Sequence, residues 1–120
     1  MQIGLIGGIG PAATDYYYRS LISEFAREKK ALELTVVHAD TPTLLNNLEK
    51  NDVDAQVKIY NRLTDRLASA GAECVVVTSI AGHFCIDTFK KSSSLRVIDM
   101  LTEVDEAIRN RGLTRVGSVR

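Results

Sequence analysis

The sequence has little of several features that would assign it to a protein class. It contains no tryptophan, only two prolines and two cysteines, and no excess of either charge, because 15 basic residues balance 15 acidic ones. Balanced charge gives no electrostatic argument for a nucleic-acid or anionic-membrane partner. No apolar run approaches the roughly 20 residues that span a bilayer, and the N-terminus lacks the basic start and long apolar stretch of a signal peptide. We therefore expect a cytoplasmic protein with no nucleic-acid or membrane partner.

The cysteines also argue against two kinds of site. Cys74 and Cys85 belong to no C-x-x-C pair and no spaced Cys/His set, so we expect no metal site. In a reducing compartment they are predicted to be free thiols. Cys74 lies in an apolar strand and is predicted to be an inert core residue. The 120 residues contain no repeat, linker or low-complexity tract, and their number suits one domain with a real core.

A glycine-rich stretch opens the chain at residues 1–14. It predicts a short strand that is apolar on both faces, a turn containing Gly7, Gly8 and Gly10, and a helix with Pro11 in its first turn. Glycine lets the chain turn sharply or approach a ligand closely. The backbone N–H groups of the turn and the positive end of the helix dipole form a natural anion site, for which carboxylate and phosphate are both candidates.

Strands alternate with helices along the rest of the chain. This alternation predicts an α/β fold with three αβα layers, built on a flavodoxin-like parallel sheet of about four strands plus a truncated fifth. After the first strand, the predicted strands lie at 34–37, 73–78, 95–98 and 115–119. The predicted helices lie at 11–30, from a cap at Asn51 or Asp52 to Gly71, from about 83 to 91, and at 99–112. Residues 41–51 are predicted to form a loop with one helical turn at 44–48.

Three loops, at residues 7–14, 40–47 and 79–83, are expected to meet at the carboxyl edge of the sheet, where α/β proteins bind ligands. A dinucleotide is one possible ligand, since Gly8, Gly10 and Ala13 match G-x-G-x-x-A and Asp40 follows the next strand. However, Pro11 lies inside the turn that should hold the pyrophosphate, and Asp40 lies beyond the usual spacing of about 20 residues. The predicted sheet also has too few strands for a dinucleotide-binding domain. These departures disfavour a dinucleotide-binding domain.

A second interpretation rests on a family resemblance. Residues 7–14, Gly-Gly-Ile-Gly-Pro-Ala-Ala-Thr, resemble the opening Gly-Gly-Met-Gly-Pro-x-Ala-Thr signature of the aspartate/glutamate racemase family. The likeness continues through the second predicted helix, residues 70–73, the third strand with its loop to His83, and residues 97–99. The resemblance implies a cofactor-independent, typically dimeric amino-acid racemase with two similar lobes across a cleft. One cysteine from each lobe then removes or returns the Cα proton of a small amino-acid or dicarboxylate substrate.

The sequence departs from this family in the loop after the third strand. The family has roughly Pro-Cys-Asn-Thr-x-His there, whereas residues 78–83 are Thr-Ser-Ile-Ala-Gly-His. Ser79 therefore takes the catalytic position, and a serine hydroxyl needs a neighbouring base to act as one. Cys85 lies nearby in sequence, but we expect the following helix to point it elsewhere. The resemblance implies substrate-binding positions at Gly8, Ile9, Gly10, Thr14, Thr41, Thr78, Ile80, Ala81 and His83.

The resemblance also divides the chain. It implies an N-terminal lobe at residues 1–113 and the start of a truncated second lobe at 114–120, without the partner cysteine. We therefore expect an isomerase-family chain with little or no racemase activity of its own, which self-associates as a dimer through exposed apolar surface. Two alternatives stay open. One is a branch of the superfamily, similar to its decarboxylases, that uses one thiol from the other lobe with Thr78 and Ser79 as hydrogen-bond donors. The other is a non-catalytic carboxylate-binding or assembly lobe. Ser79 as a plain helix cap and Asp40 as a substrate contact also stay open.

Overall fold

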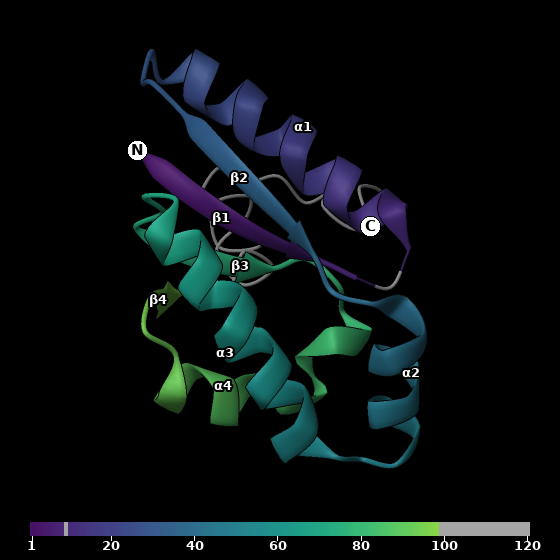
Figure 1. Cartoon of the computed structure of the whole chain (residues 1–120). Helices are drawn as coiled ribbons and strands as arrows, with labels where there is room; N and C mark the ends of the chain where they lie inside the picture. Colours follow the sequence, from purple (N-terminus) through teal and green to yellow (C-terminus); the bar gives the residue numbers. More distant parts are fainter. Residues whose placement is uncertain (9, 99–120) are drawn as a thin grey trace.

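The computed structural model describes residues 1–8 and 10–98. The strands are β1 (Gln2–Gly7), β2 (Glu33–His38), β3 (Cys74–Val77) and β4 (Arg96–Val97). The helices are α1 (Pro11–Arg27), α2 (Thr41–Glu49), α3 (Val53–Ser69) and α4 (Ile86–Ser92), with a 3₁₀ helix, η1, at Ala81–Cys85. α1 lies on one face of the sheet, and α3 and α4 lie on the other (Figure 1). The predicted α/β fold is confirmed, while the helix expected at 99–112 and the strand expected at 115–119 lie outside the described residues.

The four strands are all parallel and follow the order β2-β1-β3-β4. β1 is central, because Ile6 pairs with Val37 of β2 on one side and with Val77 of β3 on the other. The carboxyl ends of these three strands consequently share one edge. This is the flavodoxin-like order, in which ligands bind where the chain switches from one side of β1 to the other.

Alternate residues of β1 face two separate cores. Ile3 and Leu5 pack in one cluster with Leu21 of α1. Ile6 packs in a larger cluster with residues of α3 and α4, including Leu67. All four residues of β3 are also buried, as expected for a parallel strand that is covered on both faces. The continuous apolar runs in the sequence therefore indicated the central strands correctly.

The segment predicted as a loop at 41–51 is instead helix α2. Asp40 is its N-cap, and the Asp40 carboxylate accepts hydrogen bonds from the Thr43 backbone N–H at 3.2 Å and the Thr43 hydroxyl at 2.6 Å. Pro42 lies in the first turn, where a helix tolerates a missing donor. Leu44 and Asn47 are buried, and the Asn47 amide donates to the side-chain oxygen of Gln56 at 2.8 Å. Pro42 thus fits the start of a helix, and Asn47 contributes to the contact of that helix with α3.

Other boundaries differ less. α1 ends at Arg27 rather than at residue 30, and the segment after β3 begins as a 3₁₀ helix before it becomes α4. Asp52 caps α3 as predicted, since its carboxylate accepts the Ala55 N–H at 3.2 Å. Within residues 1–8 and 10–98, no helix has the length and apolar character to cross a membrane.

Gly4 of β1 provides a test of the packing between β1 and α3. A Cβ atom at residue 4 would lie 2.7 Å from Cδ1 of Leu67, whose side chain is fully buried. Gly4→Ala should therefore lower the free energy of unfolding by about 1–3 kcal/mol, and Leu67→Ala should lower it by about 2–5 kcal/mol. Because shortening Leu67 also removes the clash, the double variant should lose less than the sum of the two single losses.

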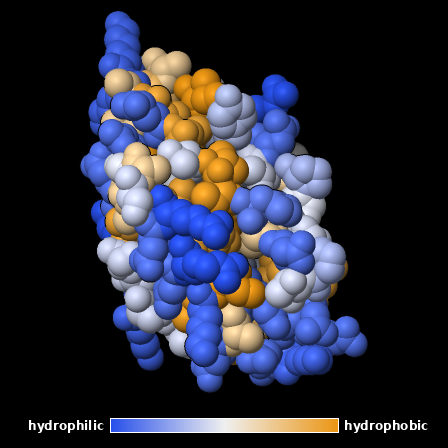
Figure 2. Space-filling view, viewed as in Figure 1, coloured by the Kyte–Doolittle hydropathy of each residue, from blue (hydrophilic) through white to orange (hydrophobic). Residues whose placement is uncertain are grey.

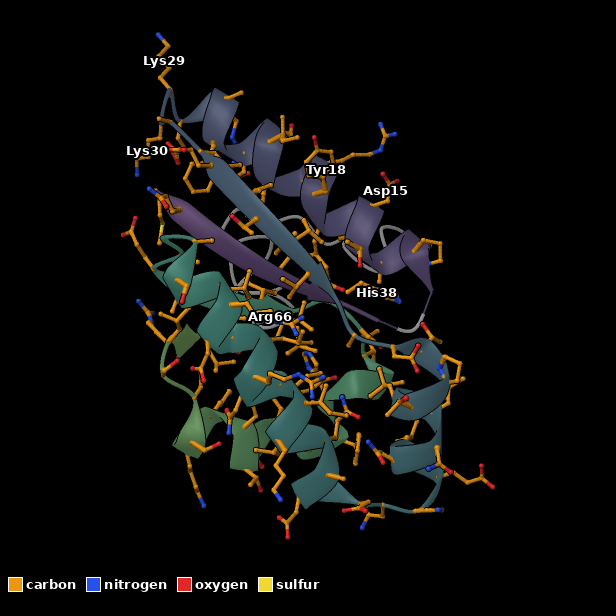
Figure 3. The ribbon with its side chains drawn as sticks, in the orientation of Figure 1. Asp15, Tyr18, Lys29, Lys30, His38 and Arg66 are labelled. Carbon is orange, nitrogen blue, oxygen red and sulfur yellow. The ribbon has the colours of Figure 1, made fainter. Side chains whose placement is uncertain are left out.

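Urea denaturation measures the free energy of unfolding for the two single variants and the double variant. Arg66→Ala is the matched control, because Arg66 is exposed on the same helix (Figure 3). It should change the free energy of unfolding by no more than about 0.5 kcal/mol. Strictly additive losses in the double variant would contradict the close approach of Leu67 to Gly4.

The cap of α2 predicts a pH dependence. Hydrogen bonds from the Thr43 side chain, and then from its backbone N–H, hold the pKa of Asp40 below its ordinary value of 3.8. A lowered carboxyl pKa stabilises the folded state above the unfolded pKa, and this stabilisation is lost as the pH falls through the folded value. Thr43→Ala should raise the pKa of Asp40 toward 3.8, as followed by NMR titration of its carboxyl carbon. Asn46→Ala, at an exposed site on α2, should leave this pKa unchanged, and an unchanged pKa in Thr43→Ala would contradict the cap.

Candidate functional site

The glycine-rich turn joins the end of β1 to the start of α1. Gly8 is buried, and Gly10 has a φ of 73°, a left-handed conformation that side chains other than glycine rarely adopt. Gly10 is the N-cap of α1 and makes no side-chain capping hydrogen bond. The N–H groups of the first turn that follow Pro11 therefore lack a side-chain cap at this edge, in the arrangement that suits an anion. Ile9 lies outside the described residues.

Two threonines connect this turn to the end of β3. The Oγ1 atoms of Thr14 and Thr78 lie 2.9 Å apart, and the Thr78 hydroxyl donates to the carbonyl oxygen of Ile6 at 3.2 Å. Because Thr78 has one proton and a carbonyl can only accept, Thr14 is the donor to Thr78. The Thr14 oxygen therefore keeps free lone pairs and is suited to accept a hydrogen bond from a ligand rather than to donate one.

Thr41 connects the segment predicted as a loop at 40–47 to the same turn. Its hydroxyl donates to the carbonyl oxygen of Gly8 at 2.9 Å, at the point where β2 leads into α2. Asp40, an expected ligand contact, instead accepts hydrogen bonds from Thr43 as the cap of α2. The structure thus brings together the segments that carry Gly8, Thr14, Thr41 and Thr78, and it gives Asp40 a structural partner.

A groove of about 710 Å³ lies beside the turn, between α1 and β2. Asp15 and Tyr18 line it from α1, and His38 lines it near the end of β2 (Figure 3). Asp15 accepts a hydrogen bond from the Arg19 guanidinium at 3.0 Å. Among the described residues that line this groove there is no lysine or arginine. None of them therefore supplies an ammonium or guanidinium group for the second carboxylate of a dicarboxylate ligand.

Ser79 follows β3, whose register with β1 places it next to the glycine-rich turn. Its side chain is only 4% exposed, and its Oγ accepts the backbone N–H of Gly82 at 3.2 Å. Ser79 therefore binds a backbone N–H of η1 from the residue before its N-cap, since Ile80 holds the N-cap position and makes no side-chain capping bond. In the part of the chain that the structure describes, no carboxylate or imidazole is hydrogen-bonded to Ser79, so the hydroxyl has no base to activate it. Ile80 is 72% exposed at the same edge.

His83 is held by the strand before it. Its Nε2 lies 2.8 Å from the carbonyl oxygen of Val77. Since a carbonyl can only accept, Nε2 carries the proton, and in the neutral ring Nδ1 keeps its lone pair. The hydrogen bond to the Val77 carbonyl therefore fixes the ring, and Nδ1 can still accept a hydrogen bond.

Cys85 lies in the core rather than at the edge. It is 2% exposed, and its thiol makes a weak 3.8 Å contact with the carbonyl oxygen of Gly82. Burial raises the pKa of this thiol to about 11. A thiol that stays protonated and buried near neutral pH is a poor proton acceptor, which agrees with the expectation that it points away from the site.

Tyr60 of α3 is not among the site residues predicted from the sequence. In the structure it is 1% exposed, and its hydroxyl donates to the Gly82 carbonyl oxygen at 3.1 Å. The available signal was a tyrosine at a core position that phenylalanine would fill equally well, because a buried hydroxyl normally requires a hydrogen-bond partner.

Comparisons with known proteins agree with this geometry. Residues 6–119 match the family model for Asp/Glu/Hydantoin racemase. A protein assigned as an Asp/Glu racemase from Yersinia pestis has a similar solved structure, with 22% sequence identity and a TM-score of 0.78. So does an aspartate racemase homologue from Pyrococcus horikoshii OT3, with 29% identity and a TM-score of 0.74.

Each match covers 92% of this chain and 50% of the solved chain, so the chain spans about half the length of these two structures. At 22% identity the first likeness shows the fold alone. The family model is more informative, because it extends from the end of β1 almost to residue 120. The chain belongs to the Asp/Glu/Hydantoin racemase family.

Proposed function

We propose that the carboxyl edge of this sheet binds the α-carboxylate of a small amino-acid or dicarboxylate substrate and forms one half of a cofactor-independent racemase site. The observation that carries the proposal is the meeting of an uncapped helix N-terminus with Thr14, Thr41 and the residue-79 loop at one edge. The first-turn N–H groups would bind the carboxylate. The free lone pairs of Thr14 would accept from the substrate ammonium group.

Racemisation requires more than binding. The Cα proton of an amino acid is very weakly acidic, so the site needs a base on one face, an acid on the other, and donors for the developing charge. We propose that Ser79 occupies the position of the first base and serves as a hydrogen-bond donor instead, since its oxygen already accepts from Gly82. The 120-residue chain should therefore have little or no racemase activity alone.

We further propose that residues 1–113 are the first of two lobes and that residues 114–120 begin the second. The solved structures similar to this chain are about twice the length of the segment it matches, which supports this division. A partner cysteine would then come from outside the sequence described above.

Ser79→Cys tests the assignment of residue 79. A cysteine thiol has an ordinary pKa of about 8.5 and forms a usable fraction of thiolate near neutral pH, unlike a serine hydroxyl. In heavy water, Ser79→Cys should accelerate loss of the Cα proton signal of D- or L-aspartate or glutamate by at least about tenfold over the parent. Without a second base, deuterium should enter without inversion of configuration. Proton NMR follows the exchange and chiral chromatography follows the configuration.

Ser79→Ala is the matched control and should exchange no faster than the parent. Equal rates in Ser79→Cys and Ser79→Ala, together with saturable broadening of an added dicarboxylate, would favour the binding-lobe alternative over the half-site. Exchange with inversion in the parent chain would show that the assignment of Ser79 as a donor is wrong.

An assembly role is the second candidate, and exposed apolar residues favour it. Ile22 of α1 is 44% exposed and Val36 of β2 is 48% exposed. Apolar side chains gather over β2 and the adjoining part of α1 (Figure 2). We propose that two copies of the chain associate through this surface, since exposed apolar patches mark interaction sites.

Light scattering tests self-association. Val36→Lys should shift a dimer toward monomer, because it places a charge in the apolar surface. Leu45→Lys is the matched control, since Leu45 is equally exposed, at 46%, but lies on α2. A parent chain that stays monomeric at high concentration would contradict the assembly role.

A further inference from the structure

The segment that follows Ser79 is hydrogen-bonded to α3. Tyr60 projects from this helix, and its hydroxyl donates to the Gly82 carbonyl oxygen at 3.1 Å. The N–H of the same residue, Gly82, donates to Ser79 Oγ at 3.2 Å. Both backbone groups of Gly82 are therefore in use, one toward the core and one toward the candidate catalytic position.

The absence of a side chain at residue 82 makes this arrangement possible. A Cβ atom on Gly82 would collide with the Tyr60 hydroxyl oxygen. Tyr60 and Gly82 therefore fit each other as a pair: the tyrosine supplies the hydroxyl and the glycine leaves the space for it. A shift of this segment away from α3 would break the hydrogen bond from Tyr60 to Gly82.

Core packing alone does not account for the hydroxyl. The Tyr60 ring packs against Phe89, with ring centroids 5.3 Å apart, and a phenylalanine at residue 60 would keep this contact. Burying a hydroxyl is unfavourable unless it is hydrogen-bonded. Its acceptor here is a backbone carbonyl of η1, two bonds from the N–H that donates to Ser79.

We propose that Tyr60 is a positioning residue for position 79, which it orients by fixing Gly82. The inference rests on the proposed function, in which residue 79 faces the substrate. A fixed Gly82 N–H orients the side-chain oxygen of Ser79 and leaves the hydroxyl proton of Ser79 to donate to a ligand. At a cysteine in the same position, the same N–H would stabilise the thiolate.

A titration in the Ser79→Cys background tests the proposal. Tyr60→Phe removes the hydrogen bond that holds the Gly82 carbonyl to α3, so the Gly82 N–H should be less well positioned to donate to the introduced thiolate. The rate of alkylation by iodoacetamide at residue 79 should fall about three- to tenfold at pH 7.5. The midpoint of its pH profile should move upward. Tandem mass spectrometry assigns alkylation to residue 79 and separates it from the free thiols of Cys74 and Cys85.

Thr64→Val is the matched control. Thr64 lies one turn after Tyr60 on α3, is fully buried, and its hydroxyl has no hydrogen-bond partner among the described residues. Removing it should leave the alkylation profile at residue 79 unchanged. An unchanged profile in Tyr60→Phe would overturn the proposal. An equal shift in Thr64→Val would also overturn it, because the effect would then reflect general loosening of α3.

A second measurement checks the pairing of Tyr60 with Gly82 through stability. Gly82→Ala should lower the urea midpoint because of the collision with the Tyr60 hydroxyl, and adding Tyr60→Phe should restore part of the loss. No restoration would contradict the pairing.

The two proposals fail separately. If Ser79→Cys does not accelerate Cα proton exchange but Tyr60→Phe raises the midpoint of its alkylation profile, the half-site is overturned and the positioning role is supported. If Ser79→Cys accelerates Cα proton exchange and its alkylation midpoint is the same with and without Tyr60→Phe, the half-site is supported and the positioning role is overturned.

Discussion

The parallel pairing of β1 with β3 is the constraint on which the candidate site depends. Because Ile6 is opposite Val77, the residues that follow, Gly7 and Thr78, lie side by side at the carboxyl edge of the sheet. The backbone N–H of Thr78 continues the ladder by donating to the Ile6 carbonyl at 3.1 Å, and its hydroxyl donates to the same oxygen. A shift of one residue would turn each side chain of β3 to the opposite face, which both cores resist. The position of the glycine-rich turn relative to Ser79 is therefore fixed by burial.

The polar groups around this edge are largely occupied with one another. Thr14 donates to Thr78, Thr41 donates to Gly8, and Ser79 accepts from Gly82. This internal bonding holds three loops in place without a ligand, which is the condition for binding with little reorganisation. It also limits what each hydroxyl can offer, because a proton already donated within the protein is unavailable to a substrate. The chemistry of the edge is thus set by which donors and acceptors are left over.

Family membership and activity are separate questions for this chain. The fold needs apolar strands, glycine at the turn and the correct register, and it is indifferent to whether residue 79 carries oxygen or sulfur. Proton abstraction depends on that one atom, because a thiol and a hydroxyl differ greatly in acidity. The same α/β framework accordingly supports a racemase in some members and, in our proposal, a binding half-site here.

Local apolar patterns in the sequence predicted the parallel α/β class and the buried strands β1 and β3, and one distinctive motif indicated the family. The sequence left the cap of α3 open between Asn51 and Asp52, and the structure selects Asp52. The prediction of a loop at α2 was wrong, since proline and asparagine are common both in loops and near the start of a helix. The Asp40 cap and the burial of Leu44 and Asn47 favour the helix. Tertiary structure alone decided that Tyr60 reaches Gly82, 22 residues along the chain, and that Thr14 donates to Thr78, 64 residues along. Such bonds depend on how elements pack against each other, and no local pattern encodes the distance between two side chains from different elements.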